Sequence, residues 1–146
     1  MPYFLHNNLN RSTKGGILVE AALVIPILTG ITFFIVEVSN VLFLTNSLNQ
    51  VAREACRYAV VTASYTKEDL ITSSRANELL PDVSRLTLNI DPAIGANRNA
   101  GTKITVNVEY NYTPIINPFR IFNLNKSWIP SIKSSSVGRS EVSNAQ

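Results

Sequence analysis

Glu20 is the residue whose chemistry is most constrained by its neighbours in this sequence. It is the only charged residue between Ile17 and Val36, a run of twenty residues dominated by Ile, Leu, Val and Phe. A carboxylate in such a run costs free energy inside a membrane unless it finds a partner, so it is a candidate functional group. The alternative is an interfacial Glu at a helix start, stabilised by the positive end of the helix dipole. Position alone leaves both interpretations open.

Two glycines and a second carboxylate stand on either side of this residue. Gly15 and Gly16 precede it, and they follow a segment that carries Arg11 and Lys14 but no acidic residue. Glu37 stands near the outer end of the apolar run. It either marks the membrane interface or contacts a partner helix, and the sequence leaves both roles open.

Other residue types that support catalysis or metal binding are scarce. The chain has one cysteine, Cys56, and one histidine, His6, so it can form neither an internal disulfide nor a Cys/His metal cluster. No nucleophile stands with a base, and the glycines form no phosphate-binding motif. We therefore expect no enzyme activity, no cofactor and no metal. Cys56 is expected to pack within a helix, with an intermolecular disulfide as the alternative.

The apolar run is predicted to be a single membrane-spanning helix. At about 1.5 Å per residue, a helix of about 20 residues covers the ~30 Å hydrocarbon core of a bilayer. The core helix of a soluble domain is the alternative, but further apolar residues up to Leu44 favour a membrane span. Pro26 and Gly30 are typical of membrane helices, and Pro26 is expected to kink or loosen the helix locally.

Residues 1–15 are predicted to remain in the cytoplasm. This segment lacks the apolar core that a secretory signal needs before its cleavage site. Arg11 and Lys14 lie directly before the span, and basic residues there hold that end of the chain inside. The remainder is therefore expected to be exported.

The helix is predicted to extend beyond the membrane, from Ile17 to Thr62. In its second half, apolar positions spaced by three and four residues form one face, and polar residues lie opposite. The apolar positions are Leu44, Leu48, Val51, Ala55, Tyr58, Ala59 and Thr62. This face is expected to lie against a globular head of roughly 100 residues.

A second helix is predicted at the start of the head. Thr66 and Asp69 form a capping-box pattern, which opens a helix from Lys67 to Leu80. Pro81 is expected to end it, since proline cannot continue a helix.

The rest of the head is predicted to form a three-stranded antiparallel sheet, so the fold class is α+β. Alternating apolar residues predict strands at 85–90 and 103–112, and a third strand is expected at 132–142. The aromatic, proline-rich connection 113–130 either packs internally or meets another subunit.

The charge of the chain argues against nucleic acid as a partner. Thirteen basic and ten acidic residues give a formal net charge of +3, and the basic residues are not clustered. Binding to a phosphate backbone uses a clustered basic surface. We therefore expect no nucleic-acid interface.

The order of Gly15, Gly16 and Glu20 before a long apolar helix resembles the processing site of type IV prepilins and pseudopilins. In those precursors a membrane peptidase cuts after a glycine, and Glu becomes the fifth residue of the mature chain. The resemblance implies a cut between Gly15 and Gly16. It also implies that Glu20 pairs with the N-terminal amine of a neighbouring subunit during assembly.

A longer stretch resembles the TadE-like pseudopilins of the tight-adherence (Flp) pilus system. Those proteins typically read VEFALV, a proline, an aliphatic run, a second Glu and an AREGARYA-like segment. The matching positions here are Val19 to Val24, Pro26, Glu37, Ala52 to Ala55 and Arg57 to Ala59. Ala21 stands where the family usually has Phe or Tyr, and Cys56 occupies a position that is usually small and apolar.

The resemblance implies three regions: a basic prepilin leader at 1–15, a transmembrane helix at 16–44 and an exported pilin-like head at 45–146. It implies a minor pseudopilin of the bacterial inner membrane, with a cytoplasmic N-terminus and a periplasmic head, that supports adhesion and biofilm formation. The implied partners are a prepilin peptidase, other pilins or pseudopilins, and the pilus assembly platform.

A second hypothesis is an unprocessed single-pass membrane protein whose exported head binds an envelope assembly partner. Ala21 favours it, because an aromatic residue after the Glu is part of the peptidase signature in the family that the chain resembles.

Overall fold

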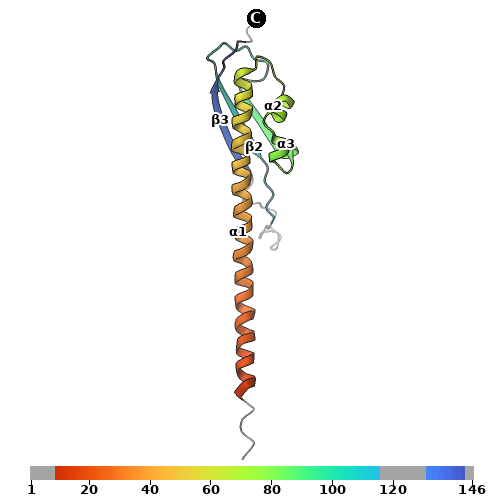
Figure 1. Ribbon diagram of the computed structural model, residues 1–146, viewed down its shortest axis with the longest axis vertical. Coiled ribbons are helices and arrows are strands. Elements are labelled where there is room, and N and C mark those ends of the chain that lie inside the picture. Colours follow the sequence, from red (N-terminus) through yellow and green to blue (C-terminus); the bar gives the residue numbers. More distant parts are fainter. Residues whose placement is uncertain (1–8, 116–130, 144–146) are drawn as a thin grey trace, which may run out of the picture. The chain divides into compact units, whose positions relative to one another are not determined.

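The computed structural model describes residues 9–115 and 131–143, with the side chains of the first helix from Gly15 onward. The chain divides into two compact units, Met1–Val38 and Ser39–Gln146. Between Leu9 and Val38 the first unit is entirely helical, and the second unit combines helices with a sheet (Figure 1). The predicted α+β fold class is confirmed.

Helix α1, Leu9–Val61, runs without a break through the apolar run (Figure 1). It begins at Leu9, earlier than the predicted start at Ile17. Gly15 and Gly16 are both helical, and no residue between Leu9 and Gly15 is a proline that would interrupt the helix. Pro26 lies inside it and removes one helical hydrogen bond, yet the helix continues.

Polar hydroxyls within the apolar run bond to the backbone of their own helix. The Thr29 hydroxyl donates to the Ile25 carbonyl at 2.8 Å, and the Thr32 hydroxyl donates to the Leu28 carbonyl at 2.9 Å. Such bonds remove the cost of placing a hydroxyl in hydrocarbon.

The apolar side chains of α1 between Ile17 and Val36 face outward, with Leu23 66% exposed and Phe34 60% exposed. From Gly15 onward the helix is long and apolar enough to cross a membrane, with a mean hydropathy of 2.2 in an 18-residue window that is not buried. One such helix near the N-terminus fits a single-pass membrane protein.

In the second unit, one face of α1 belongs to the same hydrophobic core as the sheet. The predicted face is confirmed, because its aliphatic residues are buried while Tyr58 and Thr62 are half-buried. Its buried residues are Leu44, Leu48, Val51, Ala55 and Ala59. Cys56 is buried as expected, with 4% of its surface exposed.

The sheet has the strand order β1-β2-β3 and is antiparallel throughout, as predicted (Figure 1). The strands are β1 (Leu86–Asp91), β2 (Lys103–Tyr110) and β3 (Ile132–Arg139). Leu88 pairs with Val108, and Tyr110 pairs with Ile132. All four side chains are buried, since alternate residues of each strand face the core.

The third strand ends at Arg139 rather than at the predicted Val142. Beyond it the backbone turns onto the helix, where the Glu141 N–H donates to the Val60 carbonyl at 3.0 Å. A backbone group bonded to α1 is not available to extend the ladder with β2.

Strand β3 approaches α1 closely. A Cβ atom on Gly138 would lie 2.6 Å from Val60 Cγ2 and 3.1 Å from Cys56 Sγ. Farther along the strand, the Ser134 hydroxyl donates to Asn49 Oδ1 at 2.7 Å. Gly138 therefore sets how near the strand lies to the helix.

The prediction of one helix from Lys67 to Leu80 was wrong. The structure has two short helices, α2 (Lys67–Ser73) and α3 (Ala76–Leu79). Arg75 between them has φ 56°, in the left-handed region, which breaks a right-handed helix. The predicted capping box is confirmed: the Asp69 N–H donates to Thr66 Oγ1, and the Thr66 N–H donates to Asp69 Oδ2.

The predicted connection 113–130 lies mostly outside the described residues, which resume at residue 131. Of its first three residues, Pro114 is buried and Ile115 is exposed.

Candidate functional site

Glu20 lies on the exposed surface of α1 among apolar side chains. Gly16 precedes it by four residues on the same helix, so the two positions are neighbours on one helix face. Ile17 and Leu23, three residues to either side, are 65% and 66% exposed. The carboxylate is thus the only charge on the described surface of this part of the helix.

Glu37, the second predicted carboxylate, has a different environment. Only 6% of its surface is exposed, whereas Glu20 is exposed. Seventeen residues separate the two on the same helix, which corresponds to about 25 Å along its axis. The structure therefore brings Gly16 and Glu20 together but leaves Glu37 apart from them.

Arg98 was missed by the sequence analysis, although it makes the densest set of polar contacts among the described residues of the head. It lies in the β1–β2 loop and is 4% exposed. Nη1 donates to the Ala59 carbonyl at 3.0 Å, and Nη2 donates to the carbonyls of Thr62 and Ala63 at 2.9 and 2.7 Å. The carbonyls at a helix C-terminus lack intrahelical partners, so this guanidinium caps the end of α1.

The aromatic ring of Tyr65 completes the surroundings of this buried cation. The guanidinium carbon lies 4.8 Å from the ring centroid, within the range of a cation–π contact. Nη1 also donates to the Tyr65 hydroxyl at 3.2 Å. Burial raises the pKa of Tyr65, and the nearby positive charge of Arg98 partly opposes this shift. The arrangement is a structural clamp, since every group in it is held by another group of the chain.

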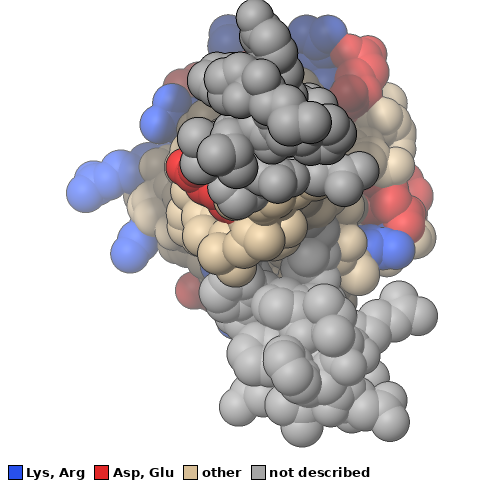
Figure 2. All heavy atoms as spheres, turned by 90° about the horizontal axis from the view of Figure 1, so that it is seen from below, with Lys and Arg blue, Asp and Glu red and all other residues tan. Residues whose placement is uncertain are grey.

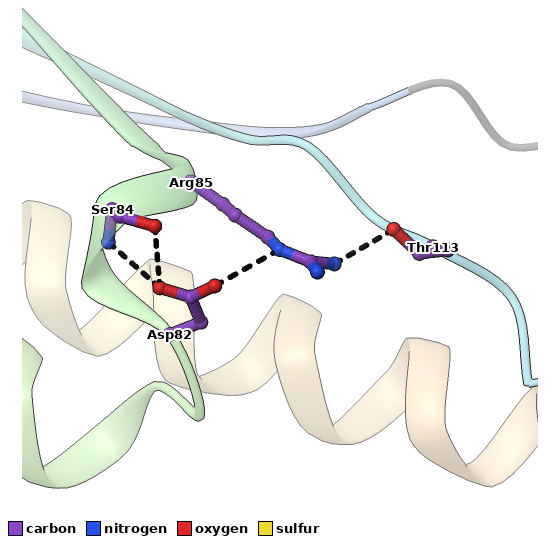
Figure 3. Close-up of polar contacts among 4 residues, drawn as sticks. All are labelled: Asp82, Ser84, Arg85 and Thr113. Carbon is purple, nitrogen blue, oxygen red and sulfur yellow. Dashed lines mark hydrogen bonds and ion pairs between the residues drawn. The ribbon is translucent and has the colours of Figure 1, made fainter.

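A second polar cluster fixes the turn before β1 (Figure 3). Arg85, in the 3-10 helix η1 (Val83–Arg85), donates from Nε to Asp82 Oδ2 at 3.0 Å and from Nη1 to the Thr113 hydroxyl at 2.7 Å. The Ser84 N–H and hydroxyl donate to Asp82 Oδ1 at 3.0 and 2.6 Å. These bonds, chiefly those from Ser84, lower the pKa of Asp82. The cluster ties the chain after β2 to the turn that precedes β1.

The charged side chains of the described residues are of mixed sign on the face seen in Figure 2. Basic and acidic groups stand beside one another around its edge. Among the described residues, Lys133 Nζ pairs with Glu109 Oε1 at 3.3 Å. A surface of this kind produces no strong field of one sign.

Comparison with known proteins identifies the segment that carries the predicted site. A model of the TadE-like protein family matches residues 15–57. No match was found among curated proteins or solved structures. The match begins at the first of the two glycines and includes Glu20 and Glu37, and it associates the chain with tight-adherence pilus systems. The resemblance drawn from the sequence is thereby confirmed for the segment from Gly15 to Arg57, which matches the TadE-like family model.

Proposed function

We propose that this chain is a minor pseudopilin that assists the assembly of tight-adherence pili and acts as a structural subunit rather than an enzyme. The observation that carries the proposal is the TadE-like match over residues 15–57, which contains both the glycine pair and Glu20. Adhesion and biofilm formation would then depend on this chain through the pilus.

Membrane anchorage is supported by the surface of α1. Its apolar side chains between Ile17 and Val36 are exposed, so a solvent other than water must cover them. Arg11 and Lys14 at one end favour a cytoplasmic N-terminus and an exported head in the inner membrane.

We propose that a prepilin peptidase cuts the chain between Gly15 and Gly16. Both glycines lie within α1, and a peptidase needs an extended backbone at the bond that it cuts. A glycine in a helix interior costs about 1 kcal/mol relative to alanine, so two adjacent glycines weaken the helix at this point. Among the described residues, no atom from outside the local helix backbone lies within 4 Å of an added Cβ at either glycine.

Glu20 would act on the amine that the cut creates. In the processed chain Gly16 carries this amine, one helical turn before the carboxylate. Side chains of a helix point toward its N-terminus, so the carboxylate of a single chain is directed to its own amine. On assembly it would exchange that amine for one on a neighbouring subunit, which sets the register between helices and keeps both charges neutralised in lipid.

Complementation of a strain that lacks the gene tests this function. The wild-type chain should restore pili, and Glu20→Gln should restore few or none because the amide carries no charge. Glu54→Gln is the matched control, since it removes a charge from the half-buried part of the same helix. Normal piliation without the gene would overturn the function, and full assembly by Glu20→Gln would overturn the pairing.

A further inference from the structure

The head contains an apolar groove of about 490 Å³ that the proposed function does not use. It is built where the α1 segment of the head, the end of α3 and the chain after β2 come together. Its apolar lining includes Phe43, Leu79, Leu80, Tyr110, Tyr112 and Ile115. The groove lies wholly within the unit Ser39–Gln146.

The mouth of this groove carries large apolar side chains that stay on the surface. Phe43 is 60% exposed and Ile115 is 67% exposed, and Leu42 beside Phe43 is 58% exposed. These side chains come from two segments far apart in the sequence. Single exposed apolar residues are normal on a protein surface, but a cluster of them marks a contact surface.

The charged residues that line the groove are already paired. Glu78 accepts from Arg75 Nε at 2.8 Å, and Arg85 is held by Asp82 and Thr113 (Figure 3). The groove therefore offers apolar contact without an uncompensated charge, and its shape is fixed by the hydrogen bonds at its rim. An apolar occupant suits it better than an ion or a charged peptide.

The position of the groove along the sequence indicates what that occupant is. Phe43 and Leu44 are the last residues of the predicted membrane span, 16–44. A helix of that length rises by about 43 Å, close to the ~40–45 Å thickness of a bilayer with both interfacial regions. Phe43 thus falls at the outer headgroup region, where tyrosine side chains are also typical.

We propose that this groove is a lipid-contacting surface that seats the head on the outer leaflet of the membrane, with Phe43 and Ile115 at the boundary between the headgroups and the acyl chains. The proposal rests on the membrane anchorage in the proposed function. Seating at this depth leaves the distal end of α1, at Val61, away from lipid. Because the ion pairs at the rim are balanced, the contact depends little on the fraction of anionic lipid.

Fluorescence quenching in nanodiscs tests this contact on the full chain. With Cys56→Ala to remove the only native thiol, an environment-sensitive label is placed by Phe33→Cys, Ile115→Cys or Val61→Cys. All three native side chains are at least half exposed, so the labels are accessible. Lipids that carry a nitroxide near the headgroup should reduce the emission at position 115 several-fold, lipids that carry it deep in the acyl chain should do so at position 33, and neither should change the emission at position 61.

The pattern of quenching separates the groove from the anchor. Quenching at 33 but not at 115 would overturn the groove proposal and leave membrane anchorage intact. The absence of quenching at both positions would overturn the anchorage and the proposal with it. Equal quenching at 61 and 115 would also contradict the proposal, because the contact would not belong to the groove.

A second measurement uses the unmodified sequence and is independent of whether the cysteine variants fold. The wild-type chain is irradiated in nanodiscs that contain a phosphatidylcholine with a photoreactive acyl chain, and cross-linked peptides are identified by mass spectrometry. Cross-links at Phe43 and near Ile115 are expected. Cross-links confined to residues before Ser39, or cross-links of the groove to a second copy of the chain, would contradict a lipid-filled groove.

Discussion

The guanidinium of Arg98 lies 4.8 Å from the centroid of the Tyr65 ring, with Nη1 3.2 Å from its hydroxyl oxygen. The same group binds the carbonyls of Ala59, Thr62 and Ala63. One loop side chain therefore holds the end of α1 and the residues after it to the rest of the head.

Arg98→Met should destabilise the head by about 3 kcal/mol, because it removes the donor from one buried and two partly buried carbonyls. Hydrogen exchange should show the largest loss of protection in the last turn of α1. Arg139→Met is the matched control: Arg139 is exposed on β3, so its loss should change stability by less than about 0.5 kcal/mol. Equal losses in the two variants would show that Arg98 is not a clamp.

Gly138→Ala should destabilise the head by about 1–3 kcal/mol, as overpacking does in cores. The added Cβ would lie 2.6 Å from Val60 Cγ2, and the helix and strand must move apart to admit it. Thermal unfolding in detergent micelles measures the effect. In the Gly138→Ala background Val60→Ala should recover part of the loss, while Gly30→Ala alone, at a position with open surroundings, should not destabilise. Additive effects of the substitutions at 138 and 60 would argue against the contact.

The head should lose stability in acid. Hydrogen bonds from the Thr66 backbone and hydroxyl lower the pKa of Asp69, and those from Ser84 lower the pKa of Asp82, each from a usual value of 3.8. A carboxyl whose pKa is lower in the folded state stabilises above its unfolded pKa, and this stabilisation is lost as pH falls through the folded pKa. The unfolding midpoint should therefore fall as the pH is lowered from about pH 6 to pH 2.

The combined Asp69→Asn and Asp82→Asn substitutions should flatten this decrease. Thr66→Ala and Ser84→Ala provide the matched test, since they remove the hydroxyl donors and keep the carboxyls. These two substitutions should reduce the pH dependence of the unfolding midpoint in part. An unchanged pH dependence in all these variants would show that Asp69 and Asp82 do not cause it.

Processing should depend on the local weakness of the helix. Gly15→Ala should slow cleavage in a timed peptidase assay. Alanine stabilises the helical conformation at the bond between residues 15 and 16 by about 1 kcal/mol relative to glycine, and the peptidase must unwind it. Gly30→Ala makes the same change in α1 outside the site and should leave the rate unchanged. Equal slowing by both would mean that the general stability of α1, rather than the glycine pair, controls the cut.

Much of the fold follows from short patterns that act locally. The capping box at Thr66 and Asp69 was predicted because both partners lie within one helical turn. Leu88 and Val108 were assigned to paired strands because strict alternation specifies which face is buried. The exposed apolar surface of α1 around Glu20 likewise follows from composition alone.

Other features depend on contacts between distant residues and have no pattern in the sequence. The break at Arg75 needs a left-handed backbone, which Gly or Asn would have signalled but Arg does not. Arg98 binds mainly backbone carbonyls, whose positions carry no sequence signature. In the sequence Arg98 is only a single basic residue in a predicted loop. Its proximity to the end of α1 appears only in the folded chain.

The most direct test of the proposed function is the N-terminal residue and intact mass of the membrane-extracted chain, with and without the prepilin peptidase. The account predicts a chain that begins at Gly16 when the peptidase is present and at residue 1 when it is absent. A chain that begins at residue 1 in both samples would contradict it and would favour an unprocessed membrane anchor.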